Sequence, residues 1–255
     1  MAIVNITGAL AGNQFEPSIA VNTLNPNIMC VVAVDTSTGA TLTGFYRSID
    51  GGSTWSTTVL PQPVGYAGAE APTIDYTFPQ TFIITVHLFN GINDGTIASY
   101  TSFDDGATWQ PPVIVQPGYG TIVHNDEPFI AVDRSPGSPY RGHAYVGYTP
   151  LATTSSAIFT QRSTTQGITW EPPDRLSNPR GIHDRAAIAV GFSGQVYAGY
   201  IITGPASPSA LLRISYDGGS LINHRLKDRQ RSSHPLYRRL HPCLYPITHF
   251  EYRPI

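Results

Sequence analysis

A repeated eight-residue string constrains the fold of this chain more than any other feature of its sequence. The pattern Ser-x-Asp-x-Gly-x-Thr-Trp occurs at 48–55 and 102–109, and again at 163–170 with Thr165 in place of the aspartate. A fourth copy begins at Ser215 and stops before the Thr-Trp pair is reached. Positions 50, 104, 165 and 217 are 54, 61 and 52 residues apart, which indicates a structural repeat of that length.

The segments around each copy predict four short strands, because they are rich in β-branched and aromatic residues and are bounded by Gly, Pro, Asn and Asp. The expected first strands cover 17–22, 72–77, 128–133 and 186–191, and the second strands 28–34, 81–89, 143–149 and 195–201. The third strands cover 42–48, 95–102, 156–163 and 210–216, and a fourth strand follows at 55–60, 109–115 and 170–176. Four antiparallel strands in a unit of this length are typical of one β-propeller blade.

The string itself suits a hairpin turn that stabilises the edge of a blade. Aspartate accepts hydrogen bonds from the N–H groups of its own turn, glycine supplies a positive φ, and serine closes a local bond. Tryptophan is expected to bury its ring between the third and fourth strands. We therefore assign a structural role to Ser48, Asp50, Gly52, Trp55, Ser102, Asp104, Gly106, Trp109, Ser163, Gly167, Trp170, Ser215, Asp217 and Gly219.

The charge distribution predicts a boundary near residue 220. Residues 1–220 hold eight Arg, no Lys and fifteen acidic residues, whereas 221–255 hold seven basic and two acidic residues and show no strand periodicity. We predict blades over 1–220 and an aberrant, frameshifted or disordered basic tail over 221–255. A genuine basic tail that binds an anionic partner stays open as the alternative. The whole-chain net charge of −2 gives no reason to expect a nucleic-acid partner.

The start of the chain lacks a basic region and a long apolar stretch, so no ordinary signal peptide is expected. A cytoplasmic location and export by a non-classical route both stay open. No run approaches eighteen apolar residues, so no membrane span is predicted. Cys30 lies in an apolar run and is expected to be a buried free thiol, although a disulfide with Cys243 stays open.

The repeat resembles the Asp-box, or bacterial neuraminidase repeat, family of sialidases over residues 14–220. The resemblance implies a six-bladed propeller that acts on or binds glycans at the mouth of its channel. Six blades need roughly 300 residues or more at this repeat length. We therefore expect an incomplete propeller of about four blades, which is truncated and associates with itself through an open edge.

The catalytic set that the resemblance implies is not evident in this chain. A sialidase of this family has an arginine triad for the substrate carboxylate, with a Phe/Tyr-Arg-Ile-Pro motif at the first blade. Here that segment reads Phe15-Glu16-Pro17-Ser18-Ile19 and has no arginine. Activity, if any, would be of the exo-α-sialidase type, but we expect impaired catalysis. A non-catalytic interaction scaffold and a non-functional fragment are the alternatives.

An acidic residue precedes each expected first strand, and a histidine precedes two of them, where propeller blades converge on the central channel. Candidate catalytic residues are Asp126, Glu127, Asp184 and Arg185, and candidate ligand-binding residues are Glu16, Glu70, His124, His183 and Arg180. These groups either bind a ligand such as a glycan or cap backbone groups at the strand starts. The sequence predicts neither a cofactor nor a metal site, since no compact His or Cys spacing is present. His87, between apolar neighbours, is expected in the core.

Overall fold

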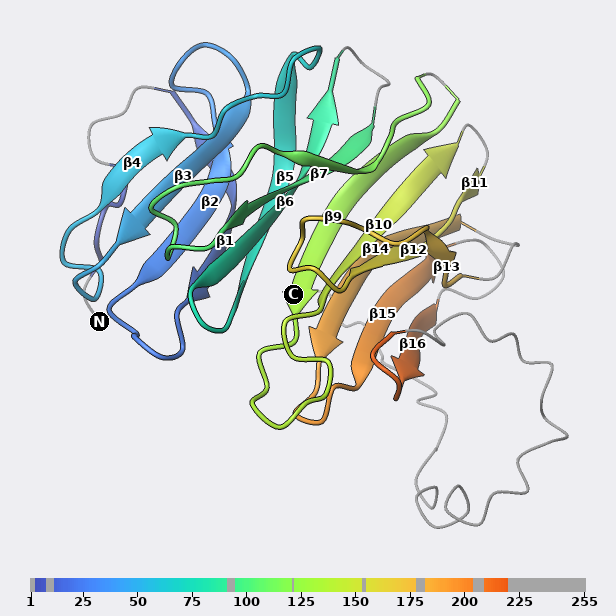
Figure 1. Cartoon of the computed structure of the whole chain (residues 1–255). Helices are drawn as coiled ribbons and strands as arrows, with labels where there is room; N and C mark the ends of the chain where they lie inside the picture. The colour runs from blue at the N-terminus through green and yellow to red at the C-terminus, as the bar shows by residue number, and fades with distance from the viewer. Residues whose placement is uncertain are drawn as a thin grey trace, which may run out of the picture. The chain divides into compact units, whose positions relative to one another are not determined.

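The computed structural model describes residues 3–7, 12–90, 95–120, 122–152, 155–177, 182–203 and 209–219. Within these ranges the chain forms sixteen strands in four antiparallel sheets and contains no helix (Figure 1). The predicted all-β class is therefore confirmed. The chain divides into two units, Met1–Asn223 and His224–Ile255. The predicted tail at 221–255 and Arg180 lie outside the described residues, so those predictions stay untested.

Each sheet is built from consecutive strands. Sheet one contains β1 (Gln14–Val21), β2 (Met29–Asp35), β3 (Leu42–Ser48) and β4 (Ser56–Val59), in that order. Sheet two contains β5 (Gly68–Thr77), β6 (Thr81–Phe89), β7 (Thr96–Ser102) and β8 (Val113–Gln116). Sheet three contains β9 (His124–Val132), β10 (Ala144–Ala152), β12 (Phe159–Ser163) and β13 (Asp174–Arg175), with β11 (Ser155–Ser156) paired to β10. Sheet four contains β14 (Ile182–Val190), β15 (Val196–Thr203) and β16 (Ser209–Ser215).

The fourth strands are shorter than the sequence predicts. Strand β8 begins at Val113 and β13 at Asp174, immediately after the pairs Pro111-Pro112 and Pro172-Pro173. Proline has no N–H to donate to a ladder, so pairing resumes only after each pair. No fourth strand is present in the described part of sheet four.

The four copies of the repeated string form equivalent hairpin turns. In the first, the Ser48 hydroxyl donates to Asp50 at 2.8 Å and accepts from the N–H of Gly52 at 2.9 Å. The carboxylate of Asp50 accepts from the N–H of Thr54 at 2.9 Å. The same bonds recur at Ser102–Asp104, Gly106–Ser102 and Thr108–Asp104, with lengths of 2.7, 2.9 and 2.8 Å.

The third and fourth turns keep this geometry despite their altered sequences. In the third, the hydroxyl of Thr165 replaces the carboxylate and accepts from the N–H of Thr169 at 2.8 Å. The N–H of Gly167 still donates to Ser163 at 2.8 Å. In the fourth, the N–H of Gly219 donates to the Ser215 hydroxyl at 3.0 Å, and the hydroxyl in turn bonds to Asp217. The side chain at the aspartate position of the string, whether Asp or Thr, therefore forms a hydrogen bond within the turn in all four copies.

Two of the three tryptophans, Trp109 and Trp170, contact the preceding sheet, which the sequence did not predict, whereas Trp55 packs on Val31, Ala33 and Tyr46 of its own sheet. Trp109 meets Phe45 of β3 edge to face with ring centroids 5.0 Å apart. The indole N–H of Trp170 donates to Ser99 of β7 at 2.9 Å. Because the sheets stack side by side, the tryptophan at the end of the second and third turns reaches the neighbouring sheet.

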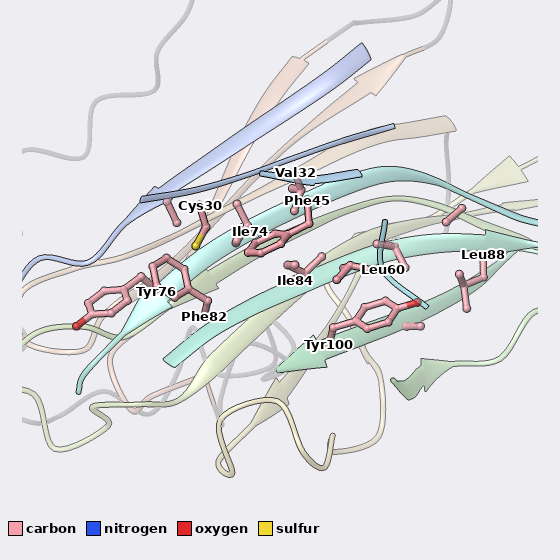
Figure 2. Packing of buried hydrophobic residues seen from close by; sticks show 14 residues of the cluster. Cys30, Val32, Phe45, Leu60, Ile74, Tyr76, Phe82, Ile84, Leu88 and Tyr100 are labelled. Carbon is pink, nitrogen blue, oxygen red and sulfur yellow. The ribbon is translucent and has the colours of Figure 1, made fainter. Parts of the chain in front are cut away.

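Buried side chains of neighbouring sheets form the core. Figure 2 shows Cys30, Val32 and Phe45 of sheet one packed against Ile74 and Ile84 of sheet two. Cys30 is a free buried thiol, as expected, and burial raises its pKa to about 12. No helix among the described residues is long and apolar enough to cross a membrane.

Candidate functional site

The first strand of every sheet carries a bulge at one equivalent place, which the sequence analysis did not predict. The expected strands at 17–22, 72–77, 128–133 and 186–191 in fact begin three or four residues earlier, at Gln14, Gly68, His124 and Ile182. The ladder to the second strand shifts register where each added segment joins the expected strand. The acidic groups thus lie inside strands and not in loops before them.

Each bulge is marked by a non-glycine residue with a left-handed backbone. These residues are Glu16, Ala71, Glu127 and Arg185, with φ of 54°, 47°, 50° and 50°. A left-handed conformation costs a residue with a Cβ roughly 1–2 kcal/mol. Strain that is kept at equivalent places in four sheets is typical of a site where the bulge re-aims a side chain. Proline follows the left-handed residue in three of the four bulges, at positions 17, 72 and 128. The ladder is interrupted at the bulge, so the missing N–H of proline costs no ladder hydrogen bond there.

The four bulges surround one cavity of about 460 Å³. Three consecutive residues from each strand line it, at 16–18, 71–73, 127–129 and 185–187. Strands β1, β5, β9 and β14 contact one another in this order, so the bulges meet although they are up to 169 residues apart along the chain, from 16 to 185. Phe129, 41% exposed, contributes an aromatic ring to the lining.

Charged side chains make polar contacts between neighbouring bulges. The carboxylate of Glu16 accepts from the N–H of Ala71 at 2.9 Å. Glu127 and Arg185 form an ion pair of 3.0 Å in which the arginine side chain is 74% exposed and the glutamate 32%. An ion pair this exposed stabilises the fold little, so both groups keep the capacity to bind a solute.

Two carboxyl groups, Glu127 in the cavity lining and Glu70 next to the lining residue Ala71, have a raised pKa. Burial raises the pKa of Glu127; the Arg185 guanidinium opposes this, and the charges of Asp184 and Asp126 add to it. Burial, followed by repulsion from Glu16 and Asp126, likewise raises the pKa of Glu70. A carboxyl with a raised pKa is suited to donate a proton.

Three of the predicted site residues line the cavity: Glu16, Glu127 and Arg185. Glu70, Asp126 and Asp184 stand one position before the left-handed residues of their strands and do not line it. His183 is fully buried and its Nδ1 lies 3.1 Å from the carbonyl oxygen of Ser156, which is a core arrangement.

The arginines near the turns are engaged in contacts elsewhere. Arg134 forms an ion pair with the buried Asp75 at 2.9 Å. Arg162 binds both oxygens of Glu171, at 3.0 and 2.9 Å. Within the described residues, Arg185 is therefore the one guanidinium in the lining of the cavity.

Phe129 and Ala71 were missed by sequence reasoning. The signal was present: Glu-Pro, Ala-Pro and Glu-Pro recur at 16–17, 71–72 and 127–128 just before an apolar run. A proline repeated at one position of a strand indicates a bulge or an edge, because it cannot pair as a central strand residue does.

Three metal-ligating side chains meet beside the cavity. Ligand atoms of His87, His124 and Asp126 all lie within 4.8 Å of one another. His87 belongs to β6 and was expected only to fill the core, where it does lie, at 3% exposure. The sequence predicted no metal site because His87 is 37 residues before His124.

Comparison with known proteins places the fold and leaves the chemistry open. No family model and no curated protein matches the chain. Among solved structures, it superposes on the GH93 α-L-arabinofuranosidase of Fusarium graminearum with a TM-score of 0.59 and 15% identity, over 80% of this chain and 63% of that one. In fold, the chain resembles propeller glycosidases.

Two sialidases match similarly. The Trypanosoma rangeli sialidase gives a TM-score of 0.53 at 16% identity, over 81% of this chain and 37% of that one. The leech intramolecular trans-sialidase gives 0.59 at 12% identity, over 86% and 52%. The chain thus spans between about a third and two thirds of these proteins. Likeness at such identity shows the fold alone.

Proposed function

We propose that the chain is a sialidase-like β-propeller of the Asp-box type, and that the cavity at its four bulges binds a glycan. The observation that carries this proposal is the single cavity lined by equivalent residues of four sheets, with Glu16, Glu127 and Arg185 in its wall. Its volume of about 460 Å³ lies in the range of small-molecule sites.

The lining suits a sugar. Carboxylates accept hydrogen bonds from hydroxyl groups, and the guanidinium donates them in a fixed fork. The exposed ring of Phe129 offers an apolar face to the C–H side of a pyranose or furanose ring. Apart from Ser18 and Thr73, the rest of the wall is proline, alanine and phenylalanine, which is typical of sites where few polar groups set orientation.

Glycosidase activity at this cavity would need an acid and a second carboxylate. Glu127 of β9, with its raised pKa, is the candidate acid, and Glu16 of β1 is the candidate partner. A sialoside also carries a carboxylate that sialidases hold with several arginines, whereas Arg185 alone lines this cavity. We therefore propose glycan binding and expect little or no release of sialic acid.

A glycan array that carries sialylated and neutral arabinose-containing sugars, probed with the full chain, tests the proposal. Glu127→Gln and Arg185→Gln should both weaken binding by about tenfold, the loss expected when a charged hydrogen bond is removed. Arg213→Gln on β16 removes the same charge away from the cavity and should bind like the wild type. Equal binding by all three variants would refute the cavity as the site, and hydrolysis of fluorogenic sialosides and arabinofuranosides separates binding from catalysis.

A second candidate function, an interaction scaffold that associates with itself, is favoured by the flank of sheet four. Leu211, Leu212 and Ile214 on β16 are 39%, 60% and 37% exposed, whereas most of the corresponding residues of β3, β7 and β12 are buried. An apolar sheet flank of this kind is typical of a contact surface. We propose a second copy of this chain as its partner.

A further inference from the structure

We propose that His87, His124 and Asp126 bind a divalent transition-metal ion of the Zn²⁺ type between sheets two and three. The Nδ1 atom of His87 lies 3.4 Å from Oδ1 of Asp126. The two imidazole rings meet edge to face with centroids 4.5 Å apart. This site stands apart from the proposed glycan function and needs none of the cavity-lining side chains.

The spacing matches that of ligands around one ion. Zinc binds imidazole nitrogen and carboxylate oxygen at about 2.0–2.2 Å, so two ligands of a tetrahedral ion lie about 3.3–3.5 Å apart. The His87–Asp126 distance of 3.4 Å meets this value directly. The other pairs lie within 4.8 Å, so closure needs at most about 1.4 Å of side-chain movement. His124 and Asp126 are only partly buried and can make that adjustment.

The donor set indicates the class of ion. Two imidazoles and one carboxylate are the ligands of three-ligand zinc sites with an open fourth position, and they suit other first-row transition ions as well. Calcium and magnesium require oxygen ligands and are disfavoured here. The Nδ1 atom of His124 is buried and has no hydrogen-bond partner among the described residues, so it is available as a ligand.

Negative charge around the three residues favours a cation. Glu70 stands opposite His87 in the β5–β6 ladder, and directly opposed residues share one face of a sheet. Repulsion from Asp126 contributes to the raised pKa of Glu70, after burial and the charge of Glu16. A bound dication would offset this repulsion.

The repeat supplies an internal comparison. The bulges align the sheets, so the same three positions can be read at each junction between neighbouring sheets. They are occupied by Val34, Gly68 and Glu70 at the first junction, by His87, His124 and Asp126 at the second, and by Thr149, Ile182 and Asp184 at the third. The fold therefore does not require histidine at these positions, and the pair at the second junction calls for another reason.

Calorimetric titration of the full chain with Zn²⁺, repeated with Co²⁺ to record the absorption of a bound ion, tests the site. Asp126→Asn and His124→Gln should each weaken binding by at least about tenfold, since loss of even an outer partner of a metal ligand costs that much. Asp184→Asn removes the equivalent carboxylate at the third junction and should leave affinity unchanged. Circular dichroism confirms that each variant is folded.

Two results would overturn the proposal. One is the absence of Zn²⁺ binding by the wild-type chain, which would leave His87 and Asp126 as a simple metal-free pair. The other is binding that persists with equal affinity in Asp126→Asn, because the ion would then be held elsewhere, for example by the histidines after residue 221. Should His124→Gln fail to fold, Asp126→Asn alone decides, since it keeps the shape of a partly exposed side chain.

Discussion

Arg47, the residue directly before the serine of the first turn, donates from Nε to the backbone carbonyl of Asp105 in the turn of the next sheet, at 2.7 Å. The same position recurs in the following sheets. Thr101 donates to the carbonyl of Gln166 at 3.1 Å, and Arg162 to that of Gly218 at 3.0 Å. The second, third and fourth turns are thus each bonded to the sheet before them, and the repeated string joins sheets as well as closing hairpins.

Loss of the first of these contacts should destabilise the fold. We expect Arg47→Met to lower the free energy of unfolding by about 1.5–3 kcal/mol, because a carbonyl loses a charged donor in a partly buried place. Arg213→Met, on a strand with no described sheet beyond it, should change stability by less than about 0.5 kcal/mol. Urea denaturation of both variants measures the difference, and equal midpoints would contradict the proposed role of the contact.

Glycine at the fifth position of the string is required more strictly where a preceding sheet is present. A Cβ on Gly106 would lie 2.9 Å from both Cys30 Sγ and the Phe45 ring, whereas a Cβ on Gly52 meets nothing closer than 3.6 Å. Both have left-handed φ, 78° and 87°, so both substitutions by alanine carry the same backbone cost. Overpacking adds about 1–3 kcal/mol for Gly106→Ala alone. Thermal unfolding of the two variants should differ by that amount, and identical values would show that the neighbouring side chains simply move aside.

Much of this arrangement could be predicted from the sequence, because it depends on local chemistry. The serine, aspartate and glycine of each string fix a turn whatever surrounds it, and alternating β-branched residues fix the strands. The contact of Trp109 with Phe45 could not be predicted, since it depends on how sheets stack. The bulge at Glu127 was missed because a strand that changes register at a left-handed residue looks, in sequence, like a loop followed by a strand.

The residues of the candidate site, too, could be predicted only where local sequence patterns indicate them. Acidic residues before each apolar run indicated convergence, and Glu16 and Glu127 do meet at the cavity. Whether Asp126 or Glu127 lines the cavity depends on the position of the bulge, so the sequence could not distinguish the roles of these two neighbours. His87 reaches His124 only through the pairing of β6 with β5 and the stacking of sheets two and three, and no local pattern encodes that contact.

Protonation of the turn aspartates should weaken the fold in acid. Hydrogen bonds from the hydroxyl and N–H of Thr54, and then from Ser48, lower the pKa of Asp50 to about 2. The unfolded value is about 3.9, so this carboxylate contributes stability that is complete above about pH 4 and is lost as pH falls through the folded pKa. The stability difference between wild type and Asp50→Asn should therefore shrink from about pH 4 to about pH 2. Thr165→Asn, in the turn without a carboxylate, should differ from wild type by a constant amount over that range. A constant difference for Asp50→Asn as well would refute the titration.

Association through sheet four can be tested at Leu212, which is 60% exposed. Counting back from the serine of each string, Leu212 occupies the position of Phe45, and Phe45 packs on the tryptophan of the next sheet. At the same position Ser99 and Thr160 are also buried, so Leu212 is the exposed member of this set. We expect Leu212→Lys to shift the full chain toward monomer in sedimentation velocity over a concentration series. Because the side chain is exposed, the stability of each monomer should change by less than about 0.5 kcal/mol.

Ile49→Lys adds the same charge at the exposed first turn and should associate like the wild type. A wild-type chain that is monomeric at every concentration, or equal association of both variants, would remove the flank of β16 as the contact surface.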